Sequence, residues 1–208
     1  MTTASALLDT LVARGQEFSR VLVAIVGPPG AGKSTLAETL KQQLQRKGLS
    51  TVVVPMDGFH LDNDELDRLN LRDRKGAPNT FDAAAFVATV KRIRAGDRSV
   101  SVPGFDREAD RVRPDCYEVD TSSRFVLIEG NYLLLSDSPW CQLRALFDLS
   151  VMLNPGFEAL EARLVQRWLD NNHAPDAARE RALSNDIPNA HYVLANSAPA
   201  DYTLSTAA

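Results

Sequence analysis

The sequence predicts an α/β fold with a mainly parallel sheet, and three observations support this prediction. Residues 21–26 form an unbroken apolar run rich in valine, which is typical of a strand buried on both faces. A turn with three glycines follows at 27–32, and leucines then recur at the spacing of a helix. Further strand and helix patterns alternate along the rest of the chain, as expected for strands connected by helices.

The length and composition limit the class of protein. The chain has 208 residues, so we expect one α/β domain spanning 1–208. A domain of this size buries roughly 70% of the surface of its unfolded chain. Lysine plus arginine is 23 and aspartate plus glutamate is 27, which gives a formal net charge of −4. This mild acidity argues against a nucleic-acid-binding protein, which would carry a basic face.

The cysteines and the apolar segments indicate a cytoplasmic protein. Cys116 and Cys141 lie far apart and outside any CxxC pattern, so we expect reduced thiols rather than a disulfide or a metal site. The N-terminus has no basic region followed by an apolar run, and no stretch approaches the ~20 residues of a membrane span. We therefore expect no membrane insertion. The oligomeric state is left open, with a homodimer as one alternative.

The first half of the chain supplies two strands and three helices. The corresponding patterns are a helix at 5–18, a strand at 21–26, a helix after the glycine-rich turn, a strand at 51–55 and a helix at 80–96. Turn-forming residues over 62–80 predict a loop before the last of these. Thr80 has the character of that helix's N-cap, with Asp82 in its first turn, and Gly96 ends it.

The second half continues the alternation. Its strand patterns lie at 100–107, 124–130, 147–153 and, as an edge strand, 200–204. The first of these is expected to run into a loop that carries Arg107, Arg111 and Arg113. Pro155 is predicted to open a helix that runs through Trp168. A helix at 177–185 is then expected to break at 185–189, before a last short helix.

The glycine-rich turn has the chemistry of a phosphate-binding loop. Its pattern is a glycine, four residues and then Gly-Lys-Ser, and its candidate nucleotide ligands are Gly27, Pro28, Pro29, Gly30, Ala31, Gly32, Lys33, Ser34 and Thr35. Small residues let backbone N–H groups form an anion nest, and the following helix adds its positive dipole end. Lys33 can reach the β- and γ-phosphates, and the Ser34 hydroxyl can ligate Mg²⁺. The alternative, a glycine-rich turn with a chance lysine, is disfavoured by the flanking strand and helix.

Two acidic residues follow the ends of predicted strands. Asp57 follows the strand at 51–55, where ligands gather in open α/β sheets, and it could accept a proton from an attacking hydroxyl or contact Mg²⁺. The alternative is a turn or helix-capping aspartate. Glu129 ends the strand at 124–130 and could hold Mg²⁺ or polarise a nucleophile, unless it caps a helix. Together with Lys33, these two residues are the catalytic candidates.

Several polar residues near Asp57 are candidates for contacting a phosphate acceptor. They are His60, Arg74, Lys75, Arg107 and Tyr132, together with Asp57 itself. For His60 a purely local hydrogen bond is an equal alternative, the charge run around Arg74 is also typical of a solvated surface, and Tyr132 has the surroundings of a packing residue. The basic loops suggest an acceptor-binding lobe over about 57–115.

A pair of arginines suggests a lid over about 155–185. Arg163 and Arg167 are four residues apart and so share one helix face, which suits a lid that folds onto a triphosphate. The alternative is a solvated face in which Glu158 and Glu161 pair with these arginines.

The motifs together resemble the phosphoribulokinase, uridine kinase and bacterial pantothenate kinase family of P-loop kinases. The motifs that carry this resemblance are the P-loop, Met56–His60, Arg74–Pro78, Phe105–Arg107, Ile128–Tyr132 and the arginine-bearing lid. They cover nearly the whole chain in the right order. The chain is most similar to short bacterial proteins described as fructose-transport-system or fructokinase-like kinases.

The resemblance implies a fold and an activity. The fold is the three-layer α/β/α P-loop NTPase fold with a five-stranded sheet in the order 2-3-1-4-5. The activity is transfer of the ATP γ-phosphoryl group to a hydroxyl of a small metabolite, with Mg²⁺ as cofactor and a sugar as the first candidate acceptor. The family's catalytic base maps onto Asp57, its strand-end glutamate onto Glu129 and its lid arginines onto Arg163 and Arg167.

Departures from the family pattern concern the acceptor. Uridine kinases usually have Ser-Phe-Tyr after the aspartate, where this chain has Gly58-Phe59-His60, and pantothenate kinases share Asp-Gly-Phe but are longer. A nucleoside or pantothenate-like acceptor therefore remains an alternative. A regulatory GTPase is disfavoured because no lysine is followed by any residue and then aspartate. An ATPase that assists a transporter or partner protein is the other alternative.

Overall fold

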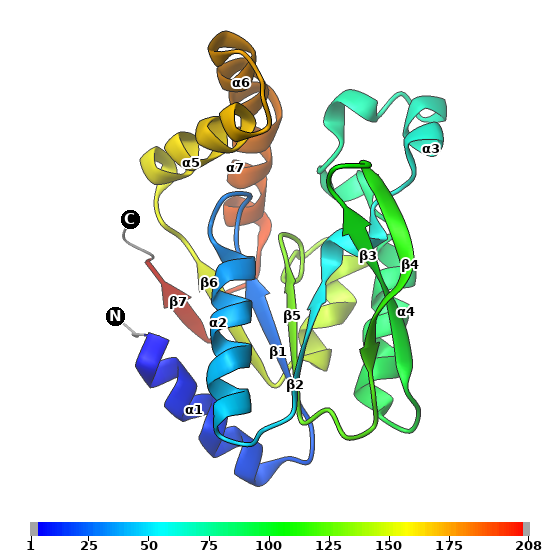
Figure 1. Cartoon of the computed structure of the whole chain (residues 1–208), viewed down its shortest axis with the longest axis vertical. Helices are drawn as coiled ribbons and strands as arrows, with labels where there is room; N and C mark the ends of the chain where they lie inside the picture. Colours follow the sequence, from blue (N-terminus) through cyan, green and yellow to red (C-terminus); the bar gives the residue numbers. More distant parts are fainter. Residues whose placement is uncertain (1–3, 206–208) are drawn as a thin grey trace.

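The computed structural model describes residues 4–205, and a five-stranded parallel sheet forms its centre. The sheet order is β2-β5-β1-β6-β7 (Figure 1). Its strands are β1 (Val21–Val26), β2 (Thr51–Pro55), β5 (Phe125–Gly130), β6 (Leu149–Leu153) and β7 (Tyr202–Leu204). Numbered among themselves along the chain, they follow the order 2-3-1-4-5. The predicted α/β fold and sheet order are therefore confirmed.

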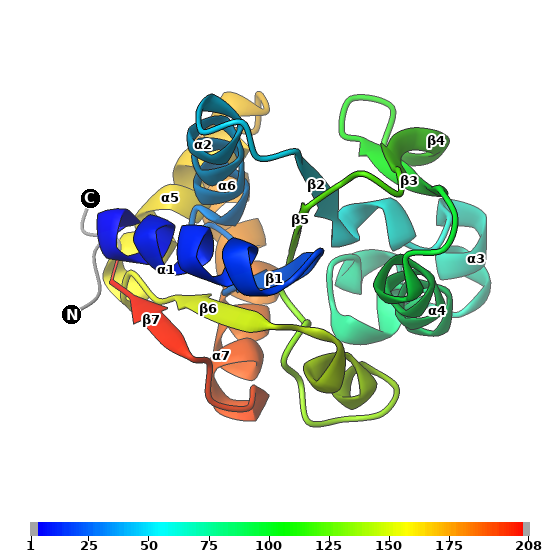
Figure 2. The same cartoon turned by 90° about the horizontal axis from the view of Figure 1, so that it is seen from below.

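Helices cover both faces of this sheet, which gives three layers (Figure 2). One face packs on α1 (Ala4–Glu17), α2 (Lys33–Arg46) and α5 (Phe157–Asp170), and the other on α4 (Ala83–Ala95) and the 3₁₀ turn Trp140–Leu146. The residues of β1 alternate between these two cores, since Leu22, Ala24 and Val26 join one and the intervening residues join the other. Every residue of β1 is buried, which explains its unbroken apolar run.

The chain between β2 and β5 builds a second structure beside the sheet. It begins with a 3₁₀ turn (Met56–Phe59), α3 (Asn63–Arg68) and two further 3₁₀ turns (Arg72–Arg74 and Pro78–Thr80). After α4, an antiparallel pair forms from β3 (Val100–Asp106) and β4 (Arg111–Val119). Arg111 and Arg113 therefore lie on a strand, and the loop predicted for them is wrong. The alternation of β4 is interrupted in sequence by Pro114 and by Asp115, whose φ is 52°.

The N-cap predicted for α4 is wrong by two residues. The chain stays extended at Phe81, and the side chain of Asp82 accepts a hydrogen bond from the Ala85 amide at 2.9 Å. Thr80 is buried instead, where its hydroxyl donates to the Ala77 carbonyl at 2.8 Å and accepts from the Gly76 amide at 2.9 Å. Thr80 therefore closes the loop before the helix rather than capping the helix.

The C-terminal third also departs from the prediction. β6 begins at Leu149 rather than residue 147, and α5 begins at Phe157, after Gly156 with φ 88°, rather than at Pro155. The helix predicted at 177–185 is α6 (Pro175–Arg181), and no break follows it. A π-helical turn (Ala182–Asp186) leads directly into α7 (Ile187–Asn196), which accommodates a proline in its first turn. No helix within residues 4–205 has the length and apolar character that a membrane crossing requires.

The N-cap of α4 gives a stability prediction. Asp82→Ala should lower the free energy of unfolding by about 1 kcal/mol, because the first turn of the helix loses its side-chain acceptor. This corresponds to a fall in melting temperature of roughly 2–4 °C for a chain of this size. Asp82→Asn keeps an acceptor oxygen and is the matched control. Equal melting temperatures for Asp82→Ala and the wild type would contradict the assignment.

Candidate active site

The loop between β1 and α2 presents the N-terminus of α2 to the sheet edge. Gly32 is the N-cap of α2 and has φ 92°, a left-handed conformation that glycine adopts without strain. The N–H groups in the first turn of this helix have no intrahelical acceptor and face the preceding loop. The helix dipole adds positive potential at the same place. The Lys33 ammonium group is buried and donates to the Pro28 carbonyl at 2.9 Å. The loop therefore has the backbone form and the cation of a phosphate site.

Ser34 and Glu129 meet at the carboxyl end of the sheet. Ser34, in the first turn of α2, donates its hydroxyl to Glu129 Oε1 at 3.0 Å. Glu129 lies in β5, where it is in register with Ile25 of β1 and with Pro55 of β2. The parallel register therefore brings the end of β5 against the P-loop that follows β1.

Asp57 lies two residues beyond Pro55, in the 3₁₀ turn that follows β2. Its Oδ2 accepts a hydrogen bond from Arg107 at 2.5 Å, across the turn from the end of β3. Gly58 permits this approach, because a Cβ at that position would lie 2.1 Å from the Pro103 carbonyl oxygen. The glycine after Asp57 thus lets β3 pack directly on the turn that carries the carboxylate.

The charges of these residues act on one another. Burial lowers the pKa of Lys33, while the carboxylates of Glu129 and Asp57 oppose this shift and the guanidinium groups of Arg167 and Arg107 add to it. Burial also raises the pKa of Glu129, with Lys33 opposing and Asp57 reinforcing the shift. Two carboxylates and a buried ammonium group therefore share one electrostatic environment, as perturbed groups in active sites commonly do.

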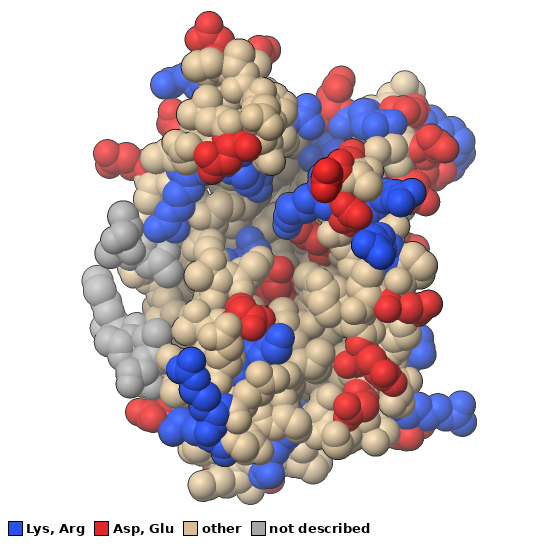
Figure 3. Space-filling model, in the orientation of Figure 1, with Lys and Arg blue, Asp and Glu red and all other residues tan. Residues whose placement is uncertain are grey.

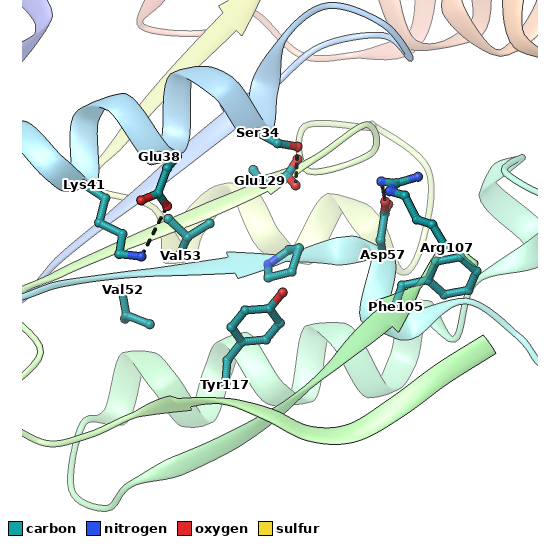
Figure 4. A pocket seen from close by; sticks show the side chains of 11 residues that line it. Ser34, Glu38, Lys41, Val52, Val53, Asp57, Phe105, Arg107, Tyr117 and Glu129 are labelled. Atoms are coloured by element: carbon teal, nitrogen blue, oxygen red, sulfur yellow. Dashed lines mark hydrogen bonds and ion pairs between the residues drawn. The ribbon is translucent and has the colours of Figure 1, made fainter. Parts of the chain in front are cut away.

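A cavity of about 370 Å³ opens beside these groups. It is lined by Ser34, Glu38, Lys41, Val52, Val53, Pro55, Asp57, Phe105, Arg107, Tyr117 and Glu129. Figure 4 shows that the lining comes from α2, from β2 and the turn after it, from the β3–β4 pair and from the end of β5, with the Tyr117 hydroxyl pointing into the space between them. In the space-filling view the surface is hollowed in this region, with acidic side chains inside the hollow and basic ones on its sides (Figure 3).

The oxygen ligands at the loop fit Mg²⁺. The Ser34 hydroxyl and the Glu129 carboxylate lie 3.0 Å apart, and both are hard oxygen donors. Residues 4–205 contain no group of three or more His, Cys, Asp or Glu side chains that could hold a metal ion. The fit is therefore to an ion held by one or two protein oxygens together with substrate phosphates, which is the usual arrangement for Mg²⁺ in kinases.

His60 and Lys75 form a supporting layer behind the cavity wall. The His60 ring stacks on Phe81 at a centroid distance of 4.0 Å and lies 4.8 Å from the Phe105 ring. Its Nδ1 is buried without a partner among the described residues. Lys75 bonds Asp110 at 2.7 Å and lies 5.0 Å from the centre of the Phe105 ring. The structure thus places both candidates against the wall residue Phe105.

The structure places Tyr132 and Arg74 away from the main cavity. Tyr132 is fully buried and donates its hydroxyl to the Gly76 carbonyl, so it supports the loop from below rather than facing a ligand. Arg74 is exposed and lines a second cavity of about 300 Å³, together with Asn189 and Tyr192 of α7.

Arg163 and Arg167 lie on α5, and the structure distinguishes them. Arg167 pairs with Asp186 at 3.0 Å and adds a positive charge near Lys33. Arg163 is partly exposed one turn earlier and makes no hydrogen bond or ion pair with the described residues. The alternative pairing with Glu161 is wrong, because Glu161 pairs with Arg179 of α6 at 3.3 Å.

Tyr117 and Asp186 were missed by the sequence analysis. Tyr117 lies on β4, opposite Val102 of β3, and only recognition of that strand pair could have placed it in the cavity. Asp186 was interpreted as part of a helix break. No local pattern marks it, since its partners on α5 lie 18 and 19 residues earlier in the chain.

Comparisons with known proteins agree with this geometry. The model of the phosphoribulokinase / uridine kinase family matches residues 22–172. YggC of Escherichia coli, a protein called uncharacterized, is 36% identical over 88% of this chain and 76% of its own length. The "Putative uridine kinase C227.14" of Schizosaccharomyces pombe is 34% identical over 89% of this chain and 83% of its own.

A solved structure extends the similarity over the complete fold. It is the crystal structure of a "putative fructose transport system kinase" from Silicibacter sp. TM1040, with 43% identity and a TM-score of 0.90. The match covers 98% of this chain and 100% of that one.

His60 gives a pH prediction. Burial lowers its pKa from 6.5 to about 4, despite the nearby carboxylate of Asp57. Between pH 6.5 and about pH 4, His60 therefore binds more protons in the unfolded state than in the folded state. The stability contributed by the neutral buried ring is complete above the unfolded pKa and is lost as the pH falls towards the folded pKa. From pH 7 to pH 5, the free energy of unfolding should fall by about 2 kcal/mol more in the wild type than in His60→Phe. Urea titrations at the two pH values measure this difference, and equal falls would contradict the buried neutral histidine.

Proposed function

Since the chain belongs to the phosphoribulokinase / uridine kinase family, and is therefore an ATP-dependent P-loop kinase of small molecules, we propose that it phosphorylates a hydroxyl group of a sugar-sized metabolite. The observation that supports this proposal best is the grouping of Lys33, Ser34, Asp57 and Glu129 at one end of the sheet. A phosphate loop alone would support nucleotide binding. The cavity beside Asp57 adds a place for a second substrate.

In the proposed reaction Asp57 is the general base. Its Oδ2 is held by Arg107, and its Oδ1 has no hydrogen-bond partner among the described residues. An acceptor hydroxyl at Oδ1 gives its proton to the carboxylate as its oxygen bonds to the γ-phosphorus. The bond between that phosphorus and the bridging oxygen breaks, and ADP leaves with the electron pair of that bond. Arg107 keeps the carboxylate aimed during this step.

The remaining groups stabilise the charge that the transfer develops. The Lys33 ammonium group lies at the P-loop, where it would neutralise the β- and γ-phosphates of a bound nucleotide. Its burial strengthens the attraction between the ammonium group and the phosphates. Ser34 and Glu129 would hold Mg²⁺, which neutralises phosphate charge and orients the phosphates when bound. We assign Gly27–Thr35, Arg163 and Arg167 to the nucleotide, with residues 155–185 as the lid.

The acceptor is proposed to occupy the cavity of about 370 Å³, within the segment 57–115 and its neighbours. This volume suits a monosaccharide, and the cavity combines carboxylate and guanidinium groups with the apolar surfaces of Val52 and Phe105. The name of the Silicibacter relative refers to fructose transport, which also favours a sugar as the acceptor. ATP is abundant in the cytoplasm, and we place the reaction there.

A nucleoside is the second candidate acceptor. The aromatic side chains of Phe105 and Tyr117 form one wall of the cavity, and such rings can stack on a base. The fission-yeast relative is named as a uridine kinase. A pantothenate-like acceptor and an ATPase that assists a partner protein remain as further alternatives.

A screen with purified protein tests the proposal. The protein is incubated with ATP, Mg²⁺ and a panel of sugars, nucleosides and hydroxy acids, and products are detected by the mass of one added phosphate. We expect ADP release to depend on one class of acceptor. An equal rate of ADP release without any acceptor would favour the ATPase alternative.

Substitutions at two site residues give the corresponding kinetic prediction. Lys33→Ala should lower kcat by roughly 10²–10³, because one charge-stabilising donor is lost. Asp57→Asn should lower kcat by roughly 10²–10⁴, because the base is lost, while nucleotide affinity is retained. Asp64→Asn, at an exposed aspartate of α3, is the control. Near-normal turnover by Asp57→Asn would refute its assignment as the base.

A further inference from the structure

A π-helical turn at Ala182–Asp186 joins α6 directly to α7. Such turns shift the register of a helix and are frequent at functional sites. In Figure 1 the turn belongs to the group of helices α5, α6 and α7, which stands opposite the segment that carries α3. Two successive residues of the turn, Asn185 and Asp186, are polar and nevertheless buried.

Asp186 ties the turn to α5. Its Oδ2 accepts a hydrogen bond from Arg167 at 3.0 Å and another from the Trp168 indole at 2.7 Å. The guanidinium groups of Arg167 and Arg181 both lie 5.2 Å from the centre of the Trp168 ring. Because a buried carboxylate that loses its cation is costly, Asp186 and Arg167 are expected to move together.

Arg167 also connects this cluster to the P-loop. The P-loop packs on α5 about one turn before Arg167, since a Cβ at Gly30 would lie 3.2 Å from the Leu164 side chain. A guanidinium group has five donors, and the hydrogen bond from Arg167 to Asp186 uses one of them. The others are free to bind a phosphate group while the Asp186 contact is kept.

Asn185 ties the same turn to the loop 72–80 on the other side. Its Nδ2 donates to the Lys75 carbonyl at 2.9 Å, and its Oδ1 is buried without a partner among the described residues. The neighbouring Gly76 faces Asn189, one helical turn after Asn185, and its carbonyl accepts a hydrogen bond from Tyr132. The loop 72–80 therefore rests on the π turn and on the chain just after β5.

We propose that the π turn couples the two substrate sides of the enzyme, with Asp186 and Asn185 as positioning residues. Nucleotide binding holds Arg167, Arg167 holds Asp186, and Asn185 in turn holds the backbone of the loop 72–80. The inference rests on the proposed function for the identity of the nucleotide. It adds a physical link between the nucleotide and the loop 72–80, whose Lys75 lies 5.0 Å from the ring of the cavity-wall residue Phe105. Neither residue touches the reacting atoms in this arrangement.

Amide hydrogen exchange tests the coupling without knowledge of the acceptor. The probe is the β,γ-imido analogue of ATP with Mg²⁺, and exchange is followed in residues 27–35 and in the loop 72–80. In the wild type we expect the analogue to slow exchange in both segments. Asp186→Asn and Asn185→Ala should keep the protection of 27–35 and lose that of 72–80.

A matched control separates coupling from general stability. Glu161→Gln removes the exposed ion pair between Glu161 of α5 and Arg179 of α6, whose Oε1 and Nη2 atoms are 3.3 Å apart. This pair does not involve the π turn. This variant should keep protection in both segments. Since Asp186→Asn is isosteric, it tests the inference even where Asn185→Ala fails to fold.

The outcomes distinguish this inference from the proposed function. Protection of 72–80 that survives in either Asp186→Asn or Asn185→Ala would overturn the coupling, and so would a wild type in which only 27–35 is protected. A wild type without protection of 27–35 would overturn nucleotide binding itself, and the coupling with it.

Discussion

The register of three parallel strands is the constraint on which the site depends. Glu129 of β5 stands beside Ile25 of β1 and Pro55 of β2, so the P-loop after β1, Asp57 after β2 and the end of β5 reach the same edge. A shift of one residue in β5 would turn the Glu129 side chain to the opposite face of the sheet, away from Ser34. Because both faces of these strands are buried, the apolar cores themselves fix the position of the candidate catalytic groups.

The carboxyl-end edge of the sheet carries several charged side chains, and burying any of them without a partner of opposite charge would be unfavourable. Lys33 and Glu129 are both buried, and each offsets part of the desolvation cost of the other. Asp57 is more exposed and is paired instead with Arg107, whose side chain is largely exposed. The candidate site therefore combines a buried half at the P-loop with a more open half beside Asp57.

How far the sequence predicts this arrangement depends on how local each signal is. The P-loop and the strand-end positions of Asp57 and Glu129 follow from short motifs and apolar runs. The order of the five strands was implied by the family resemblance, and the structure confirms it. The N-cap at Asp82, the strand β4 and the π turn were not predicted. Two of these depend on contacts outside the local sequence: β4 pairs with β3, and Asp186 is satisfied by side chains of α5. The Asp82 cap is a local contact with the Ala85 amide, and the predicted cap lay two residues before it.

The contrast between local motifs and contacts among separate segments also explains why the type of reaction is easier to infer than the acceptor. Phosphate binding uses consecutive backbone amides and one lysine, so nine residues in a row encode it. The cavity proposed for the acceptor is assembled from α2, β2 and the turn after it, the β3–β4 pair and the end of β5, and its walls include Tyr117, which has no motif of its own. A substitution on β4 can alter the cavity without disturbing the register of the main sheet, because β4 pairs only with β3. Acceptor preference is therefore free to diverge among proteins that keep the same catalytic edge.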